Sequence, residues 1–291
     1  MSGTEISDDP LIAGLNPQQG AAVVHAGGPL LIVAGAFSGK TRVLTRRIAY
    51  LMARRNATPY SILAITFTNK AAGEMKERVK ELVGPIAQSM WVSTFHSACV
   101  RILRQEAARL GYSNSFSIYD SADSLRLITI VSKDLNLDPK RYPPRQFQSV
   151  ISNAKSELMG PADYLNAATN QFQEVVADVY ALYQRRLQQS NAMDFDDLIL
   201  KTVEVLQRFP EAKARYRSRF RHVLVDEYQD TNHAQYILVR ELVGSDLEGL
   251  PPAELCVVGD ADQSIYAFRG ATIRNIMQFE LDYPNATTIL L

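Results

Sequence analysis

A glycine-containing segment near the N-terminus has the residue types of a phosphate-binding loop. The run LIVAGAFSGKTRVL, residues 31–44, contains Gly39, Lys40 and Thr41, which close the pattern G-x-x-x-x-G-K-[ST]. In such a loop the lysine brings a positive charge to the outer phosphates, and the threonine hydroxyl ligates magnesium. Ala34 stands where the pattern has its first glycine. On this segment alone, a strand-to-helix turn with an incidental lysine is the alternative.

Two adjacent carboxylates later in the chain have the chemistry that complements this loop. Asp226 and Glu227 follow the apolar run 223–225. The first is suited to hold magnesium through water, and the second to orient and deprotonate an attacking water. Two acids after a strand are also common as helix caps, so the pair is specific only in combination with the lysine loop. A third run, VVGDADQ, ends in Gln263, a neutral donor for a γ-phosphate. Together the three segments predict the core of a nucleoside-triphosphate hydrolase.

These side chains meet only if each segment ends a strand of one parallel sheet, because such sheets bind ligands at the carboxyl ends of their strands. From residue 29 to about 116, short strand-like runs (LLIVAG, ILAITFT, MWVSTFH) alternate with helical ones, as a parallel sheet requires. From about 117 to 189 the apolar spacing is helical, and strand signals return at RHVLVDEYQD. The pattern predicts an α/β domain (1–112 and 190–291) with an inserted, mostly α-helical domain (113–189).

The composition sets few limits on partners. The 31 basic and 31 acidic side chains cancel, so net charge neither requires nor excludes a nucleic acid. Cys99 and Cys256 lie far apart in apolar runs, which predicts buried free thiols in a reducing compartment. No segment has the length and hydropathy of a membrane span, and the polar N-terminus lacks the features of a signal peptide. We therefore expect a cytoplasmic protein that binds no membrane.

Seven motifs carry a resemblance to a known family. In chain order they are LNPQQ (15–19), AGAFSGKT (34–41), ITFTNKAA (65–72), STFHS (93–97), MDFDD (193–197), VDEYQD (225–230) and GDADQSIYAFRGA (259–271). In order and spacing they resemble the successive motifs of UvrD/PcrA/Rep-type DNA helicases, above all of actinobacterial ones. These are superfamily 1 motors that move 3′ to 5′ on single-stranded DNA. The resemblance, which extends from about residue 12 to the C-terminus, implies a P-loop NTPase fold with a RecA-like ATP-binding domain (1A) and a helical insertion (1B).

The resemblance also implies a nucleotide site that uses ATP and Mg²⁺. Gln19 corresponds to a glutamine that reads the adenine edge, and Arg42 either reaches the phosphates or is an ordinary solvated helix residue. The implied catalytic residues are Lys40, Glu227 and Gln263, and the implied Mg²⁺ ligands are Thr41 and Asp226. The residues implied to bind ATP are Gln19, Ala34, Gly35, Ala36, Phe37, Ser38, Gly39, Lys40, Thr41 and Arg42.

The same resemblance implies a binding track for single-stranded DNA, with single-strand/duplex junctions as substrates. It leaves open whether other repair proteins bind the chain. Aromatic side chains suit a translocating motor because every base has a π-face, so the grip need not depend on sequence. Taken singly, each aromatic is better explained by burial in the core, and the histidine by a structural role. The implied DNA-binding residues are Phe67, Thr94, His96, Phe195, Tyr266, Phe268 and Arg269.

Two other polar clusters have simpler interpretations. Asp194, Asp196 and Asp197 have no histidine near them in the sequence, so helix capping is favoured over a metal cluster. The basic run 208–222 has the charge to follow a DNA backbone, but it lacks aromatic or glycine patterning. A solvated helix face is therefore the preferred interpretation.

The sequence departs from the family pattern at two places. Phe37 stands where the family has glycine, and a bulky residue resists both positive φ and a close approach of phosphate, which predicts weakened nucleotide binding. Beyond Leu291 the family continues into a second RecA-like half that supplies catalytic arginines, so we expect residues 1–291 alone not to hydrolyse ATP at a helicase rate. The expected function is the N-terminal motor domain of an ATP-dependent helicase in DNA repair or replication. The alternatives are a nucleotide- or DNA-binding module without turnover and the motor part of an ATP-dependent nuclease subunit.

Overall fold

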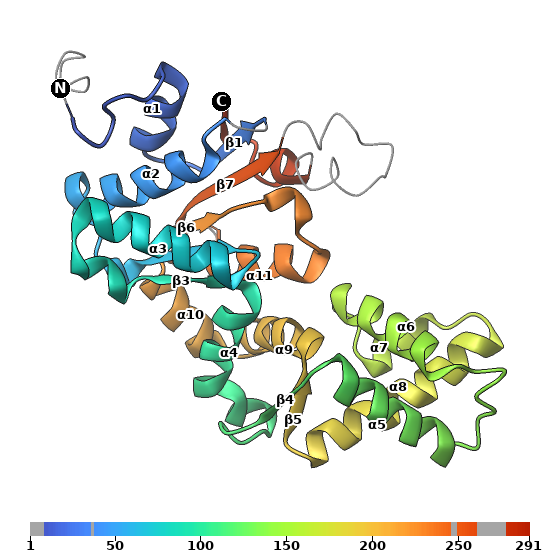
Figure 1. The fold of residues 1–291 in the computed structure, drawn as a ribbon. Helices are drawn as coiled ribbons and strands as arrows, with labels where there is room; N and C mark the ends of the chain where they lie inside the picture. Colours follow the sequence, from blue (N-terminus) through green and yellow to red (C-terminus); the bar gives the residue numbers. More distant parts are fainter. Residues whose placement is uncertain (1–8, 36–37, 246–248, 261–277) are drawn as a thin grey trace. The chain divides into compact units, whose positions relative to one another are not determined.

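The structure is a computed structural model that describes residues 9–35, 38–245, 249–260 and 278–291 (Figure 1). The chain forms two compact units. Unit 1 comprises Met1–Phe95, Ala214–Thr231 and Leu242–Leu291, and unit 2 comprises His96–Lys213 and Asn232–Glu241. Three helices contain residues of both units: α4 (Phe95–Glu106), α10 (Pro210–Arg219) and α11 (His233–Val243).

Unit 1 is built on a six-stranded sheet with the strand order β3-β2-β6-β7-β1-β8, in which every pair of neighbours is parallel. The strands are β1 (Leu30–Ala34), β2 (Ile62–Thr66), β3 (Trp91–Thr94), β6 (His222–Val225), β7 (Glu254–Asp260) and β8 (Thr287–Leu290). Because β7 lies between β1 and β6, segments far apart in the sequence end side by side. Ala34 pairs with Asp260, and Val225 pairs with Val257. The predicted α/β fold with a parallel sheet is confirmed.

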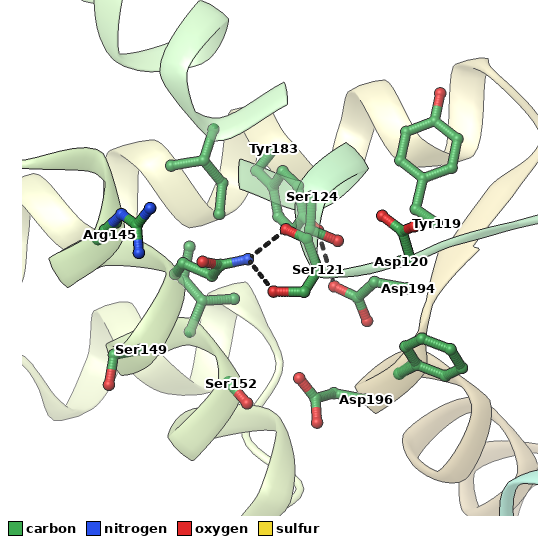
Figure 2. A pocket seen from close by; sticks show the side chains of 14 residues that line it. Tyr119, Asp120, Ser121, Ser124, Arg145, Ser149, Ser152, Tyr183, Asp194 and Asp196 are labelled. Carbon is green, nitrogen blue, oxygen red and sulfur yellow. Dashed lines mark hydrogen bonds between the residues drawn. The ribbon is translucent and has the colours of Figure 1, made fainter. Parts of the chain in front are cut away.

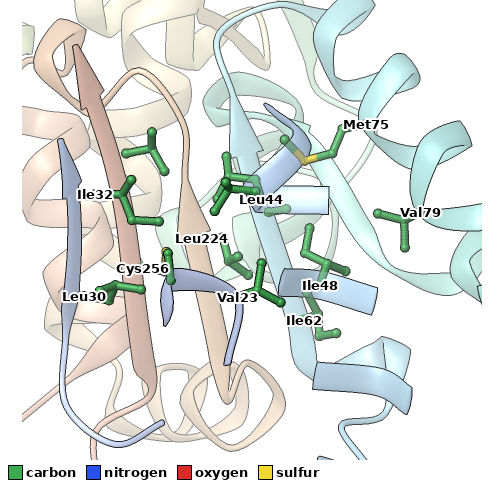
Figure 3. Packing of buried hydrophobic residues seen from close by; sticks show 14 of the residues in the cluster. Val23, Leu30, Ile32, Leu44, Ile48, Ile62, Met75, Val79, Leu224 and Cys256 are labelled. Atoms are coloured by element: carbon green, nitrogen blue, oxygen red, sulfur yellow. The ribbon is translucent and has the colours of Figure 1, made fainter. Parts of the chain in front are cut away.

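The inner strands of unit 1, such as β1 and β2, are continuous apolar runs because both faces of the sheet are buried there, whereas the edge strand β8 is mostly exposed. On one face, Leu30 and Ile32 of β1 join Cys256 of β7 in a cluster that includes Ile48 (Figure 3). The helices that contribute to this cluster are α1 (Pro17–Val24), α2 (Lys40–Arg54) and α3 (Asn69–Val83). Leu31, which alternates to the other face, is equally buried.

Local sequence explains where the helices of unit 1 begin. Asn16 and Gln19 form a capping box at the start of α1, and Thr68 accepts a hydrogen bond from the Ala71 amide at the start of α3. The start of α2 is different, because its N-cap is Gly39, which has φ +83° and offers no side chain to the helix amides. The short 3₁₀ helices are η1 (Pro59–Ser61), η2 (Pro85–Ser89), η3 (Ala107–Leu110) and η4 (Tyr228–Asp230).

Unit 2 is mostly helical. Its two short parallel strands are β4 (Ser117–Tyr119) and β5 (Ala192–Asp194), and its helices include α5 (Ser121–Asp134), α6 (Pro144–Ser156), α7 (Pro161–Ala167), α8 (Gln171–Gln189) and α9 (Phe195–Arg208). Its own core includes Ile128, Phe147 and Tyr183. Of the interval 117–189, for which helical spacing was predicted, residues 117–119 form the short strand β4, which the sequence did not predict, and residues 121–189 contain helices and no strand. The domain bounds 113 and 189 stay predictions.

Two sequence expectations concern buried and apolar features. Cys99 and Cys256 are free and buried, as predicted, and burial raises the pKa of their thiols to about 12 and about 11. Within the ranges that the structure describes, no helix combines the length and the apolar character needed to cross a membrane.

Candidate functional site

Lys40, the first residue of α2, lies among carboxylates from two other strand ends. Its Nζ atom is 2.9 Å from Oδ2 of Asp260, the last residue of β7. The same atom is 4.0 Å from Oε2 of Glu227, which follows β6. The strand order β6-β7-β1 brings these three ends together, as the combination of the lysine loop and the acid pair requires. The predicted residues Lys40, Asp226 and Glu227 therefore share one edge of the sheet.

A glutamine joins the two acidic segments of this edge. The Nε2 atom of Gln229 donates to Oε2 of Glu227 at 2.7 Å, and its Oε1 accepts from the backbone amide of Asp260 at 3.0 Å. Gln229 is buried, so its side chain acts as a fixed link between the segment after β6 and the end of β7. The sequence did not suggest a role for Gln229 or Asp260, although both belong to the motifs VDEYQD and GDADQ.

The electrostatics of the site favour a cation. Burial, followed by the charge of Glu227, raises the pKa of Asp226 to about 6. Burial and the charges of Glu227 and Asp260 also raise the pKa of Asp230, although Lys40 opposes the rise in both groups. A partly desolvated cluster of like charges is stabilised by any positive ligand that enters it.

The loop before α2 has the form of an anion site. Because Gly39 provides no side-chain cap, the first amides of α2 stay available to a ligand at the positive end of the helix. The Gln19 Nε2 atom donates to the Ser38 carbonyl at 2.9 Å, and a Cβ added to Gly39 would lie 3.2 Å from that Nε2. The Ser38 hydroxyl is buried and has no hydrogen-bond partner among the described residues.

The remaining predicted nucleotide residues fall into two groups. Ala34 and Gly35 end β1 and enter the loop, Thr41 lies in the first turn of α2, and Arg42 donates from Nη2 to the Gly14 carbonyl at 3.1 Å. That contact ties Arg42 to the N-terminal segment, an arrangement that the sequence did not suggest. Ala36, Phe37 and Gln263 lie outside the described residues, so the roles expected of them stay predictions.

Comparison with known proteins gives the family. Residues 15–284 match the family described as UvrD/REP helicase N-terminal domain. The chain belongs to this family. It is 66% identical over 288 residues to ATP-dependent DNA helicase UvrD1 of Mycobacterium tuberculosis, 62% over 292 residues to the UvrD1 of Mycobacterium leprae, and 54% over 281 residues to ATP-dependent DNA helicase PcrA of Bacillus subtilis. These alignments cover 97% of this chain but only 37–38% of the relatives' length. The predicted resemblance is confirmed.

In unit 1 of this UvrD/REP domain, the structure places two of the residues predicted to bind DNA. The ring of Phe67 meets the ring of the buried Phe95 edge to face, with centroids 5.7 Å apart. Thr94 ends β3 and is buried. Tyr266, Phe268 and Arg269 lie outside the described residues.

In unit 2, His96 and Phe195 form a second edge-to-face pair, with centroids 5.9 Å apart. Phe195 is 48% exposed, which is unusual for a large aromatic and leaves its ring available for stacking. It lines a pocket of about 330 Å³ together with Tyr119 and Asp196 (Figure 2). Burial lowers the pKa of His96, which favours its neutral form.

The two simpler interpretations of polar clusters had different outcomes. Asp194 and Asp197 form a capping box at the start of α9, as predicted, and among the described residues no cluster of three or more His, Cys, Asp or Glu side chains is arranged to hold a metal ion. The prediction of a solvated face for the basic run 208–222 was wrong in part. Arg217 is buried and donates to the Leu250 carbonyl at 3.3 Å, and Arg221 donates to the Pro251 carbonyl at 2.9 Å. Both guanidinium groups donate hydrogen bonds to backbone carbonyls that are distant in the sequence, and helix periodicity does not indicate such contacts.

Proposed function

We propose that this chain is the N-terminal motor domain of an ATP-dependent 3′–5′ DNA helicase. In this proposal it binds ATP with Mg²⁺ in unit 1 and grips single-stranded DNA through aromatic side chains, of which Phe195 is exposed. The observation that carries the nucleotide part is the position of Lys40, which lies at an uncapped helix start and contacts the acids at two neighbouring strand ends. The relatives named above are ATP-dependent DNA helicases.

The chemistry follows from what each group can do. Lys40 brings a fixed positive charge to the phosphates, which would replace Asp260 as its partner. Glu227 is the general base: its carboxylate accepts a proton from the water that attacks the γ-phosphate, and Gln229 orients that carboxylate. Gln19, whose side chain donates to the Ser38 carbonyl, would read the adenine edge of the nucleotide.

The residues present fit a magnesium ion. Thr41 and Asp226 would hold it, and the ion would supply positive charge that offsets the negative charge developing on the transferred phosphoryl group. The fit rests on the hydroxyl and carboxylate oxygens that Mg²⁺ prefers, and a divalent cation would offset the repulsion between Asp226 and Glu227 that, with burial, raises the pKa of Asp226 to about 6. The hydroxyl of Ser38, buried without a partner in the described part of the chain, is a further group that a bound ligand would satisfy.

The DNA part of the proposal rests on the exposed ring of Phe195 and on the rings of Phe67 and His96. Stacking of bases on such rings gives a grip that tolerates any sequence. We extend the proposal to single-strand/duplex junctions as substrates, to DNA repair or replication as the process, and to a cytoplasmic location. The division into domain 1A (1–112 and 190–291) and domain 1B (113–189) is also part of the proposal.

The test of the nucleotide part is titration of the chain with a fluorescent ATP analogue and Mg²⁺. We expect Lys40→Ala to weaken binding by at least roughly tenfold, because it removes the charge that faces the phosphates. Lys140→Ala, which removes an exposed lysine of unit 2, is the matched control and should bind as the unaltered chain does. Equal affinity of the Lys40 and Lys140 variants would refute the site. Nucleotide binding without turnover in the full-length protein would favour a binding module over a motor.

A further inference from the structure

The start of α9 is held by a buried cluster that the proposed mechanism does not use. Asp194 and Asp197 lie on either side of the exposed Phe195 and cap each other's backbone amides. The Asp197 amide donates to Asp194 Oδ1 at 2.8 Å, and the Asp194 amide donates to Asp197 Oδ2 at 3.3 Å. Phe195 is the first residue of α9, so the conformation of this one turn determines where its ring lies.

A lysine from another helix contacts both carboxylates. The Nζ atom of Lys155, on α6, is 2.7 Å from Asp194 Oδ2 and 2.9 Å from Asp197 Oδ1, and its side chain is fully buried. Burial alone would lower the pKa of Lys155, but the charges of the two carboxylates outweigh it and raise that pKa well above its ordinary value. The ammonium group therefore stays charged inside the core of unit 2.

Side chains of α8 complete the cluster. The Tyr183 hydroxyl donates to Asp194 Oδ2 at 2.8 Å, the contact drawn as a dashed line in Figure 2. Gln184 donates from Nε2 to both oxygens of Asp197 at 3.1 Å. The carboxylates on either side of Phe195 are thus fixed from two helices, α6 and α8, and the first turn of α9 cannot rotate without breaking a charged contact.

We propose that Lys155 is a positioning residue for DNA binding, because its ammonium group on α6 fixes the first turn of α9 and so holds the exposed ring of Phe195 ready to stack on a base. Buried ion pairs are often no more stabilising than apolar residues of similar volume, so a role in specifying one geometry is a physical reason to keep this one. The proposal rests on the proposed DNA-binding function of Phe195. The competing explanation is that Lys155 only stabilises the core of unit 2.

A double-mutant cycle on the full chain separates these explanations, with affinity for a fluorescent oligothymidylate as the readout. Phe195→Ala should weaken DNA binding by roughly 5- to 100-fold, the range for loss of one stacked base. Lys155→Met should weaken it by a similar factor, and Lys155→Met/Phe195→Ala should be no weaker than Phe195→Ala alone. Lys201→Met is the matched control, because Lys201 lies on α9 itself and pairs with Glu204 at 2.8 Å. It should bind DNA as the unaltered chain does, and all variants should keep their affinity for the ATP analogue.

Circular dichroism at the assay temperature would establish that each variant is folded. If Lys155→Met does not fold, Asp197→Leu replaces it, since that change leaves one carboxylate for one ammonium and should also weaken DNA binding. Unchanged DNA affinity in a folded Lys155→Met protein, or independent losses that multiply in the double variant, would overturn the proposal. If Phe195→Ala binds DNA normally, the positioning role falls together with the DNA role of Phe195, while the ATP titration of Lys40→Ala still decides the nucleotide part.

Discussion

Two lysines of this protein each lie between two carboxylates, in surroundings that differ. Lys40 is partly exposed, and its Nζ lies 2.9 Å from Asp260 and 4.0 Å from Glu227. Lys155 is fully buried and lies 2.7 Å and 2.9 Å from its two carboxylate oxygens. The same pairing of charges is therefore suited to two different roles. A partly solvated ammonium can exchange a carboxylate for a phosphate, whereas a buried and saturated one can only hold what it already contacts.

The helix starts beside the two lysines differ in the same way. The N-cap of α2 is Gly39, which leaves the first amides of the helix without a side-chain acceptor. The N-cap of α9 is Asp194, whose carboxylate accepts a hydrogen bond from the Asp197 amide in a capping box. The free amides at a helix start can bind an external anion only where side chains of the same segment do not already accept their hydrogen bonds. A helix start that its own side chains leave open can therefore accept an external anion, and one that they close cannot.

The largest expected effect is on stability and separates the two lysines directly. Lys155→Met leaves two buried carboxylates without their cation and should lower the free energy of unfolding by about 3–5 kcal/mol. Lys40→Met should change it by no more than about 1 kcal/mol, because its contacts are partly solvated. Urea denaturation of both variants measures the difference. Similar losses in the two proteins would contradict the division into an open and a closed cluster.

A second prediction extends the comparison to an ion pair at the other end of α2. Arg55 donates to both carboxylate oxygens of Glu254 at 2.7 Å and 2.6 Å. Burial would raise the pKa of Glu254, but Arg55 and, after it, His222 outweigh burial and hold the pKa well below its ordinary value. The pair therefore stabilises the fold fully above the unfolded-state pKa, near 4.5, and this contribution is lost as the pH falls toward the folded-state pKa.

Glu254→Gln tests this expectation. The substitution should lower the free energy of unfolding by about 1–2 kcal/mol at neutral pH, a value near the lower end for charged hydrogen bonds because the pair is partly solvated. The difference in the free energy of unfolding between the variant and the unaltered chain should shrink at about pH 3. At that pH Glu254 is protonated in the unfolded chain, so the unaltered protein also loses part of this contribution. Urea denaturation at both pH values measures it, and a difference independent of pH would contradict the assignment to this carboxylate.

A smaller effect is expected where the open helix start is altered. Gly39→Ala imposes strain of roughly 1–2 kcal/mol at φ +83° and places a Cβ against the Gln19 amide, so ATP-analogue affinity should fall about tenfold. Gly73→Ala is the control, because an added Cβ in α3 meets no atom within 4 Å. It should leave nucleotide affinity unchanged and should stabilise the fold slightly. Equal affinities of the Gly39 and Gly73 variants would show that the turn is not part of the nucleotide site.

The smallest and least structure-dependent prediction concerns Phe37, which lies outside the described residues. Phe37→Gly should tighten binding of the ATP analogue by up to about tenfold, because glycine removes a ring from the loop and accepts a positive φ freely. The expectation rests on the sequence alone. Unchanged or weaker binding would mean that the phenylalanine ring is harmless to the nucleotide or is compensated by a neighbouring residue.

Several features of the molecule follow from the sequence by itself. The mostly helical character of residues 117–189 and the capping role of Asp194 were predicted, because each depends on residues within a few positions of one another, and the parallel sheet was predicted from the alternation of strand-like and helical runs. Hydrophobic periodicity, N-cap chemistry and glycine turns act over that range. Motifs in a fixed order also gave the family.

Only the tertiary structure decided which of these elements meet. Lys40 contacts Asp260 across 220 residues because β7 inserts between β6 and β1, and no local pattern encodes that strand order. Lys155, a type of side chain that is mostly exposed in proteins, is buried against Asp194 across 39 residues of sequence. Periodicity reports which side of an element is buried but not what it is buried against. The partner of each charge is set by the packing of whole helices and strands, and here that packing leaves the cluster around Lys40 partly open and closes the one around Lys155.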